Sequence, residues 1–304
     1  MPRRSDIWRI GLVDAPIAAL AAPGALEQAA VRWLDPGPSF TFLADPFALE
    51  RDGRLQLLAE AYDYRTRHGV IDALTLDADL RVLTRRTVLR EPWHLSYPFV
   101  FEAEGETWMA PEAHRSGAFT LYRAVDFPDR WEPAARFELD TPAIDPTIFR
   151  RDGLWWMAYA PDGDQAAKQG RLHLAFADAL TGPWRPHPGN PVRIDRSSSR
   201  PGGTPFDRDG ELMLPVQDCA GTYGRAIRML RIVRLTPDAF EAEPGSAIEA
   251  PASAGAFRDG LHTLSACGAR TLIDVKRVDR SPGGWAIDLG RALGRWQAPQ
   301  AAGP

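Results

Sequence analysis

The fold is decided by a stretch at residues 145–162, which reads DPTIFRRDGLWWMAYAPD. It contains two apolar runs, one on each side of the pair Asp152-Gly153. Because glycine tolerates a positive φ, an Asp-Gly pair between two such runs is typical of a β-hairpin turn. The stretch therefore predicts two antiparallel strands joined by a tight turn.

The same pattern recurs along the chain with a period of about fifty residues, which is typical of repeat architectures. Three further copies and a fifth, degenerate one align on a turn glycine: DPFALERDGRLQLLAEAYD (45–63), YPFVFEAEGETWMAPEAH (97–114), GGTPFDRDGELMLPVQD (202–218) and LHTLSACGARTLIDVK (261–276). The successive turn glycines are separated by 52, 48, 57 and 58 residues: Gly53, Gly105, Gly153, Gly210 and Gly268.

Each copy is followed by a second pair of apolar runs, so one period holds about four strands, which is one propeller blade. The sequence thus predicts an all-β, five-bladed β-propeller with about four antiparallel strands per blade. The alternative is a β-sandwich with coincidental hairpins, which five aligned turns disfavour. Residues four positions after each turn glycine are expected to pack blade against blade: Leu57, Met109, Met157, Leu214 and Leu272.

No linker divides the chain, so we expect one domain over residues 1–304. Its expected parts are a lead-in with the N-terminal strand (1–40), five blades (41–92, 93–140, 141–196, 197–250 and 251–296) and a tail (297–304). The N-terminal strand DIWRIGLV (6–13) is expected to pair with WAIDLGRAL (285–293), because an open ring would expose two unpaired edges. Residues 241–255 are expected to form a loop.

Composition excludes several classes of partner. The formal net charge is −4, so no basic excess is available to neutralise nucleic-acid phosphates. No run of 18 apolar residues exists, so no membrane span is expected. Asp6, Arg9 and Asp14 interrupt the apolar N-terminal stretch, which is a poor secretion signal. We therefore expect a cytoplasmic protein, with Cys219 and Cys267 as free thiols.

The first strand of each blade lines the channel of a propeller, so residues at the starts of these strands converge. Eight positions before the turn glycine stand Asp45, Tyr97 and Asp145 in the first three blades. The fourth blade has Gly202 there, and the fifth has His262 two residues further on. Two carboxylates that face one pocket suit general acid/base chemistry on a glycosidic bond.

The second strands return to the same end of the propeller, and polar residues stand where they finish. The residues expected to bind substrate are Glu60, Trp93, Tyr97, Asp218, Arg225, His262 and Lys276. The aromatic residues among them offer flat surfaces for stacking on sugar rings. Structural roles remain open: an Asp at a strand start accepts backbone hydrogen bonds, His262 is equally suited to burial, and Lys276 to a salt bridge.

The layout resembles the five-bladed propellers of family 43 glycoside hydrolases, notably in LHLAFADALTGPWRPHPGNPV (172–192). The resemblance implies a general base at Asp45, a residue that tunes the pKa of the acid at Asp145, and a channel-centre histidine near a metal or water at His262. The family's general-acid Glu is missing, because blade four begins with RPGGTPF (200–206). Glu112 is the alternative proton donor.

The chain resembles more closely the N-terminal propeller of plant glucosamine inositolphosphorylceramide transferases and their bacterial relatives. The motifs that carry this resemblance are ADPF (44–47), HLSYPFVF (94–101), IDPTIF (144–149), PVQDCAGTYGRAIR (215–228) and the His-Thr pair at 262–263. In the plant proteins a glycosyltransferase domain follows the propeller.

Two hypotheses follow for the function. The first is a glycosidase or transglycosidase that uses Asp45 as base or nucleophile, Glu112 as acid and Asp145 as modulator. The second is a propeller that binds a glycan or sugar nucleotide and serves a separate glycosyltransferase or acyltransferase. A scaffold for protein interactions is disfavoured, because it has no use for carboxylates in its channel. No cofactor and no metal ligands are assigned, although a cation beside His262 is compatible with the sequence.

Overall fold

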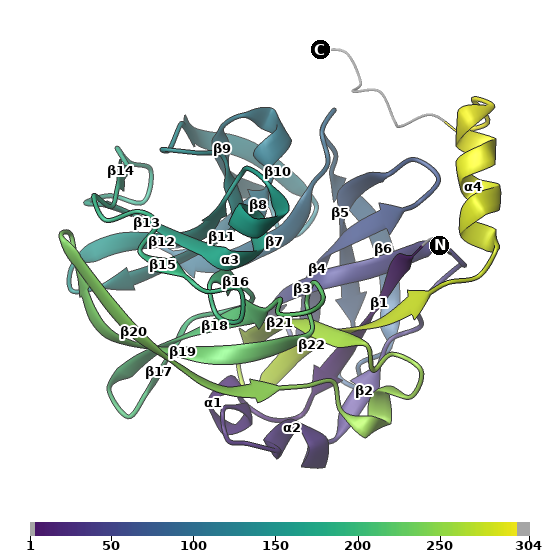
Figure 1. Ribbon diagram of the computed structural model, residues 1–304, viewed down its shortest axis with the longest axis horizontal. Helices are drawn as coiled ribbons and strands as arrows, with labels where there is room; N and C mark the ends of the chain where they lie inside the picture. The colour runs from purple at the N-terminus through teal and green to yellow at the C-terminus, as the bar shows by residue number, and fades with distance from the viewer. Residues whose placement is uncertain (1–3, 297–304) are drawn as a thin grey trace.

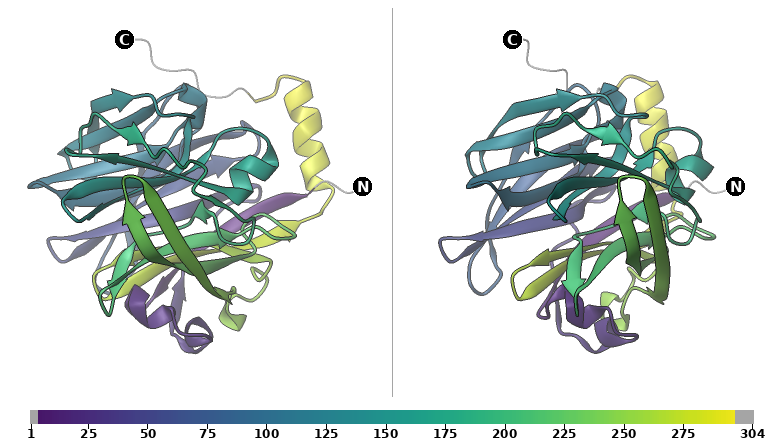
Figure 2. Two further views of the ribbon diagram at one scale, coloured as in Figure 1. Left: turned by 60° about the vertical axis from the view of Figure 1, so that its left-hand side comes forward. Right: turned by 90° about the vertical axis from the view of Figure 1, so that its left-hand side faces the viewer.

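The computed structural model describes residues 4–296 and arranges them as five antiparallel sheets around a ring (Figures 1 and 2). The prediction of a five-bladed β-propeller is confirmed. In blades one and two the strands follow one another in sequence order from the channel outward: β3 (Thr41–Arg51), β4 (Arg54–Asp63), β5 (His68–Leu76) and β6 (Val82–Leu89), then β7 (Ser96–Ala103), β8 (Glu106–Glu112), β9 (Phe119–Asp126) and β10 (Arg130–Phe137).

Blades three and four are less regular because a short strand pairs beside the main path in each. Blade three contains β11 (Ala143–Arg151), β12 (Leu154–Pro161), β13 (Arg171–Ala177), β14 (Arg185–Pro186) and β15 (Arg193–Ile194). Blade four contains β16 (Arg200–Pro201), β17 (Phe206–Arg208), β18 (Glu211–Asp218), β19 (Ala226–Thr236) and β20 (Ala239–Ile248).

Blade five joins the two ends of the propeller. Its order is β21 (Gly260–Cys267), β22 (Arg270–Asp279), β1 (Ser5–Val13) and β2 (Val31–Trp33). The helices lie outside the sheets: α1 (Ile17–Leu20), α2 (Ala25–Gln28), η1 (His114–Ser116), α3 (Gln165–Gly170), η2 (Ala252–Ala254) and α4 (Gly283–Ala292). No helix of the described residues is long and apolar enough to cross a membrane.

The repeat's acidic-Gly pairs form the predicted turns. In blade one Arg51 pairs with Arg54, and the two residues between them, Asp52 and Gly53, have φ values of 53° and 70°. Two positive φ values at a two-residue turn match the right-handed twist of the flanking strands. The equivalent turns of blades two, three and four have the same signs.

The channel strands of the first three blades share a bulge at the residue that the sequence analysis singled out. Asp45, Tyr97 and Asp145 have φ values of 50°, 45° and 51°, and the strand register shifts at each of them. A proline follows each of these residues and offers no N–H to the neighbouring strand. A bulge re-aims the side chain that it carries.

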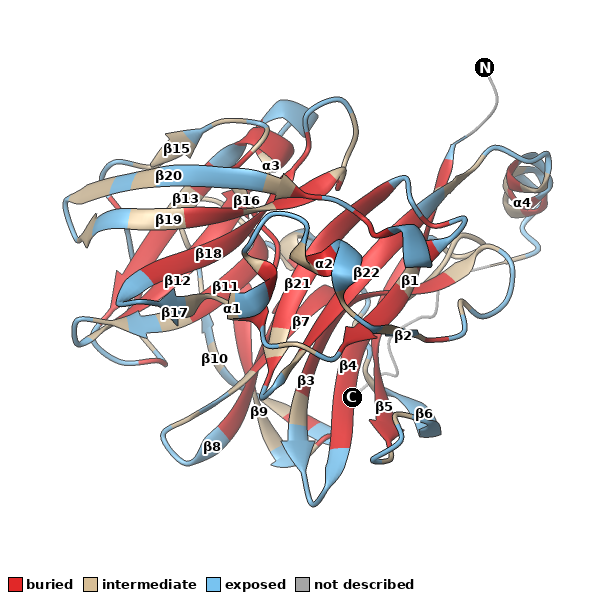
Figure 3. Cartoon of the chain, turned by 90° about the horizontal axis from the view of Figure 1, so that it is seen from below, coloured by how far each residue is buried: buried red, intermediate tan, exposed pale blue. Residues whose placement is uncertain are grey.

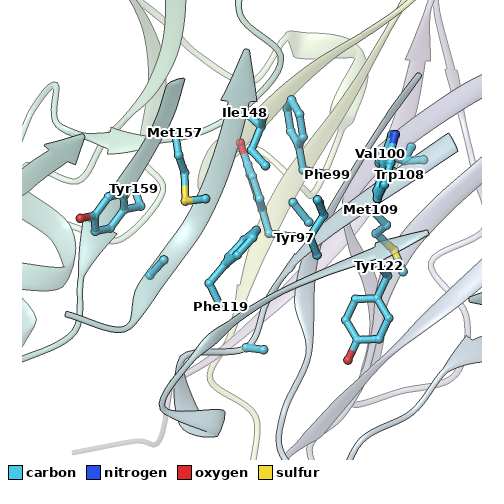
Figure 4. Packing of buried hydrophobic residues seen from close by; sticks show 14 of the residues in the cluster. Tyr97, Phe99, Val100, Trp108, Met109, Phe119, Tyr122, Ile148, Met157 and Tyr159 are labelled. Atoms are coloured by element: carbon cyan, nitrogen blue, oxygen red, sulfur yellow. The ribbon is translucent and has the colours of Figure 1, made fainter. Parts of the chain in front are cut away.

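The apolar core lies between the blades. The five residues predicted to pack blade on blade are all buried, with Leu57, Met109, Met157 and Leu272 at 0% exposure and Leu214 at 2%. Figure 4 shows the part of the core around Tyr97, Phe119 and Met157. Seen from below, the buried residues follow the inner strands of each blade (Figure 3). Cys219 and Cys267 are buried free thiols, as predicted.

Two local predictions are wrong. Residues 285–293 do not pair with the N-terminal strand, because Gly283–Ala292 form helix α4, and β1 pairs instead with β22 from Ser5↔Asp279 to Val13↔Thr271. β22 is buried from Thr271 to Lys276 and supplies the edge with which β1 pairs. Residues 241–255 are not a loop throughout, because 241–248 belong to β20 (Ala239–Ile248) on the outer edge of blade four. The predicted tail at 297–304 lies outside the described residues.

Candidate functional site

A cavity of about 590 Å³ opens at the end of the channel where the first strands begin. Its lining combines acids, imidazoles, aromatic rings and arginines: Arg4, Asp6, Trp8, Phe42, Asp45, Glu60, Tyr62, Tyr64, Arg67, His94, Ser96, Glu112, His114, Arg115, Gln165, Arg200, Tyr223 and His262. The predicted residues Asp45, Glu60, Glu112 and His262 are thus brought together from three blades. Such a concave polar site with convergent titratable groups is typical of ligand pockets.

Asp45, His262 and Asp274 form a buried network at the bottom of the cavity. The Nδ1 atom of His262 lies 2.7 Å from Asp274 Oδ1, and its Nε2 lies 3.5 Å from Asp45 Oδ1. Thr263 Oγ1 donates a 3.0 Å hydrogen bond to Asp45. The other oxygen of Asp274 accepts the backbone N–H of Asp45 at 2.8 Å. Asp274 therefore orients both the histidine and the bulge that carries Asp45.

The proton affinities of this network are shifted by burial and by the neighbouring charges. Burial raises the pKa of Asp45 to about 7, against the opposing effect of His262. Burial alone would lower the pKa of His262, but the carboxylates of Asp274 and Asp45 outweigh it and raise that pKa. The three side chains place possible ligand atoms within 4.8 Å of one another, and their oxygen and imidazole donors fit a divalent cation.

Trp8 and Tyr223 enclose His262. The Trp8 ring stacks on the imidazole with centroids 3.6 Å apart, and the Tyr223 ring meets it edge-on at 5.4 Å. Below them Lys276 is fully buried, with its ammonium group donating to the Tyr223 carbonyl and lying 3.3 Å from Asp6. Lys276 therefore supports the site from beneath and does not line the cavity.

Glu60 reaches the cavity from β4 and has one polar neighbour at close range. His94 Nε2 lies 3.4 Å from Glu60 Oε1, while the backbone N–H of Gly69 donates to His94 Nδ1 at 2.9 Å. That donation leaves the imidazole proton on Nε2. Burial lowers the pKa of His94 to about 4, so the ring is neutral at pH 7. Burial, reinforced by the charges of Asp45 and Glu112, raises the pKa of Glu60 well above its ordinary value.

Glu112 stands at the equivalent position of blade two, in contrasting surroundings. Its Oε1 accepts the backbone N–H of His114 at 2.8 Å and lies 2.5 Å from His114 Nδ1. Ser96 Oγ donates to the other oxygen at 2.7 Å. Burial alone would raise the pKa of Glu112, but the hydrogen bonds and charge of His114 outweigh it and lower that pKa to about 2. Glu112 is therefore ionised at neutral pH.

Asp145 is held in an ion pair next to the cavity. Arg200 Nε donates to its Oδ2 at 2.7 Å, and Gln217 Nε2 donates to the same oxygen at 2.9 Å. Burial alone would lower the pKa of Arg200, but the Asp145 carboxylate raises it. The Arg200 guanidinium also lies 5.0 Å from the Tyr223 ring centroid. The cationic group at the start of blade four is thus Arg200, where the hydrolase pattern has an acid.

The glycines that follow Arg200 leave no room for a side chain. A Cβ on Gly202 would lie 2.8 Å from the His262 carbonyl oxygen, and one on Gly203 would lie 1.8 Å from that of Leu264. Blade four therefore passes too close to blade five to carry a carboxylate at the first glycine.

The other predicted site residues lie outside the cavity lining. Tyr97 is buried beneath it, where its hydroxyl accepts the N–H of Gly203 at 2.8 Å. Asp218 is fully buried and bound by Arg225 at 2.6 Å and by Arg228. Trp93 packs against the core between blades one and two.

Sequence reasoning missed Asp274, His94, His114 and Trp8. Three of them had weak signals: an acid inside the apolar run TLIDV, a histidine two residues after Glu112, and a histidine two residues before β7. Trp8 had no signal of its own within the apolar strand DIWRIGLV. Local pattern does not show which residue of another blade each one meets.

Comparisons with known proteins agree with this architecture. Residues 24–264 match the family "Glucosamine inositolphosphorylceramide transferase 1, N-terminal". The enzyme of that name from Oryza sativa subsp. indica is 38% identical over 208 residues, which is 67% of this chain and 28% of the relative. The one from Arabidopsis thaliana is 35% identical over 226 residues, 73% of this chain and 29% of the relative. The chain thus spans less than a third of these relatives.

Solved structures with the same fold include glycoside hydrolases. A family 117 glycoside hydrolase of Zobellia galactanivorans has a TM-score of 0.54 at 15% identity, with 82% of this chain and 87% of that one covered. A thermostable family 43 glycoside hydrolase has a TM-score of 0.52 at 14% identity, with 73% and 84% covered. These likenesses concern the fold. The family match over most of the chain, together with the identity to the plant proteins, shows that this propeller belongs to the glucosamine inositolphosphorylceramide transferase 1 N-terminal family.

Proposed function

We propose that the cavity binds the sugar headgroup of a glycoconjugate and acts on its glycosidic bond, with Glu60 as the proton donor. The observation that carries this proposal is the difference between Glu60 and Glu112. Both acids line one cavity, yet burial keeps a proton on the first while His114 keeps the second ionised. Two carboxyl groups whose surroundings push their pKa values apart are the arrangement that acid/base catalysis on sugars requires.

The proposed roles differ from those that the sequence alone favoured. Glu60 transfers its proton to the leaving oxygen as the bond from that oxygen to the anomeric carbon breaks. Asp45, with a pKa of about 7, accepts the proton of the attacking water or alcohol as the new carbon–oxygen bond forms. Ionised Glu112 stabilises the positive charge that develops on the sugar. Asp145, fixed by Arg200, remains a positioning residue.

A non-catalytic sugar-binding propeller is the second candidate. It is favoured by the start of blade four, where Arg200 and two tightly packed glycines replace the acid of the hydrolases. Such a module would hold the glycoconjugate for a separate glycosyltransferase or acyltransferase. The same cavity and the same aromatic and acidic groups serve both candidate functions. The two candidates therefore differ in whether the protein converts the bound sugar.

The test compares alkyl and nitrophenyl glycosides as substrates of the purified chain, with a panel that includes glucosaminides and uronides. We expect Glu60→Ala to lower turnover of alkyl glycosides by about 100-fold or more, since general acid catalysis contributes at least that much. Nitrophenyl glycosides should be far less affected, because their leaving group needs no proton.

Glu106→Gln is the matched control, because Glu106 is exposed at the opposite end of β8 from Glu112 and should leave turnover unchanged. If Glu60→Ala lowers the turnover of alkyl and nitrophenyl glycosides equally, or lowers neither, Glu60 is not the general acid. Binding of a glycan without turnover of any substrate would favour the second candidate.

A further inference from the structure

Helix α4 carries its apolar side chains on the face that points away from the protein. Trp285, Leu289 and the adjoining Leu293 are 59%, 63% and 61% exposed, and they recur at helical spacing. Ala286 and Ala292, on the same face, are also exposed. The opposite face buries Ile287 and two glycines, of which Gly290 packs against the Trp296 ring. A surface helix ordinarily buries its apolar face and exposes the polar one, so α4 is oriented in reverse.

The helix lies at the edge of the propeller, apart from the blades (Figures 1 and 2), and it is tied to the rim of the cavity. Arg67, which lines the cavity, lies 3.3 Å from Asp288 in the middle of α4. Arg291, one turn later, lies 3.6 Å from the same carboxylate. At the start of the helix Gly283 packs against the Phe40 ring. The apolar face therefore adjoins the mouth of the sugar site.

Arginines surround this apolar face and the mouth. Arg4, Arg67 and Arg115 line the opening, and Arg115 is exposed with no hydrogen bond or ion pair within residues 4–296. Arg291 and Arg295 follow on the last turn of the helix and after it. Of the cavity's acids, Asp45, Glu60 and Glu112 are buried, whereas Asp6 is half-buried and pairs with Arg4. A ligand that approaches this face meets positive charge first and an apolar stripe beside it.

We propose that α4 inserts its apolar face into the headgroup layer of an anionic lipid surface, so that the cavity faces lipid-linked sugars. Tryptophan and leucine on one face with arginine beside them are what an interfacial helix requires. The surrounding arginines complement anionic headgroups, whose attraction adds to that of the buried apolar area. This inference rests on the proposed sugar site and names the carrier of its ligand.

The test is flotation of the full chain with vesicles of phosphatidylcholine containing about 30% phosphatidylserine, a composition that supplies a negative surface. We expect the chain to float with these vesicles and to bind pure phosphatidylcholine more weakly. Trp285→Ser/Leu289→Ser should lower the bound fraction by about tenfold or more, because two large apolar side chains no longer enter the lipid. Val82→Ser/Leu83→Ser, an apolar pair on β6 that is 45% and 50% exposed, should change nothing.

Three results would overturn the proposal: no flotation of the wild-type chain, equal flotation of the α4 variant, or a dimer that only the α4 variant dissociates. The last would show that the stripe pairs with a second copy. Leu293→Asp is a second variant, placed after the helix, in case the double variant folds poorly. Turnover or binding of soluble glycosides should be unaffected by either variant. If the wild-type chain does not float but binds soluble glycosides, only the membrane surface is refuted. If the wild-type chain floats but binds no sugar, only the sugar site is refuted.

Discussion

At the scale of single residues, Glu60 and Glu112 show how equivalent positions of a repeat acquire different chemistry. Each stands seven residues after its turn glycine, at the end of the second strand of its blade. Glu112 accepts hydrogen bonds from His114 and Ser96, which stabilise the charged form. Within residues 4–296 the close polar contact of Glu60 is the neutral His94, and burial together with nearby acids favours its neutral form. Their partners, rather than their positions, set their protonation.

Glu112→Gln is predicted to destabilise the protein at pH 7 and much less in acid. A pKa lowered from 4.5 to about 2 contributes stability above pH 4.5 that is lost as the pH falls toward 2. The full linkage amounts to about 3 kcal/mol in the free energy of unfolding. Urea unfolding of both proteins at pH 7 and pH 3 measures the difference, which should shrink at the lower pH.

Glu60→Gln should behave in the opposite way and serves as the comparison. Because the folded-state pKa of Glu60 is raised, its contribution is fully present below pH 4.5 and is lost as the pH rises through that higher value. Glutamine resembles the protonated form, so this variant should match the wild type in acid and equal or exceed its stability at pH 8. A stability gap for Glu112→Gln that does not change with pH would contradict the assignment of its charge.

At the scale of elements, the approach of blade four to blade five depends on one glycine. Gly203 forms a parallel bridge with Leu264, and its φ is 150°. Gly203→Ala places a methyl group 1.8 Å from a backbone oxygen. We expect the free energy of unfolding to fall by about 3 kcal/mol or more, since both strands must move apart. Thermal or urea unfolding followed by circular dichroism provides the measurement.

Gly210→Ala is the matched control for that substitution. Gly210 also has a positive φ, at 85°, but no atom lies within 4 Å of an added Cβ. Only the backbone conformation opposes alanine there, at a cost of about 1 kcal/mol. Equal effects of the two substitutions would show that the blades do not meet as closely as the structure indicates.

At the scale of the whole molecule, the ring is closed by β1, which completes blade five between β22 and β2. Nine residue pairs join β1 to β22, and Trp8 of β1 stacks on His262 of β21. Removal of residues 1–13 would leave β22 as an open edge and expose the core beneath it. We expect the truncated chain to lose cooperative unfolding, as measured by urea titration, and to aggregate.

Removal of α4 by truncation after Arg280 is the contrasting change, because that helix buries only Ile287 and two glycines. The truncated chain should unfold cooperatively, close to the wild-type midpoint. Cooperative unfolding without β1 would mean that four blades and an incomplete fifth form a stable fold, and closure would then not be a condition for stability.

The five hairpins, their turns and the apolar layers could be predicted from the sequence, because they depend on alternation and on residues only a few positions apart. It also placed Asp45, Glu60, Glu112 and His262 at one end of the molecule, since a repeat brings equivalent positions to equivalent places. The helix at residues 285–293 could not be predicted in this way, because a short run of apolar residues suits a helix as well as a strand.

Which side chains meet across the cavity depends on the folded arrangement of the blades. Asp274 orients Asp45 across 229 residues of sequence, and Arg200 binds Asp145 across 55. The protonation of Glu60 and the ionisation of Glu112 follow from burial and from neighbours such as His94, which no local pattern records. Electrostatic energies depend on distance through space and on access to water, and both quantities exist only after the chain has folded.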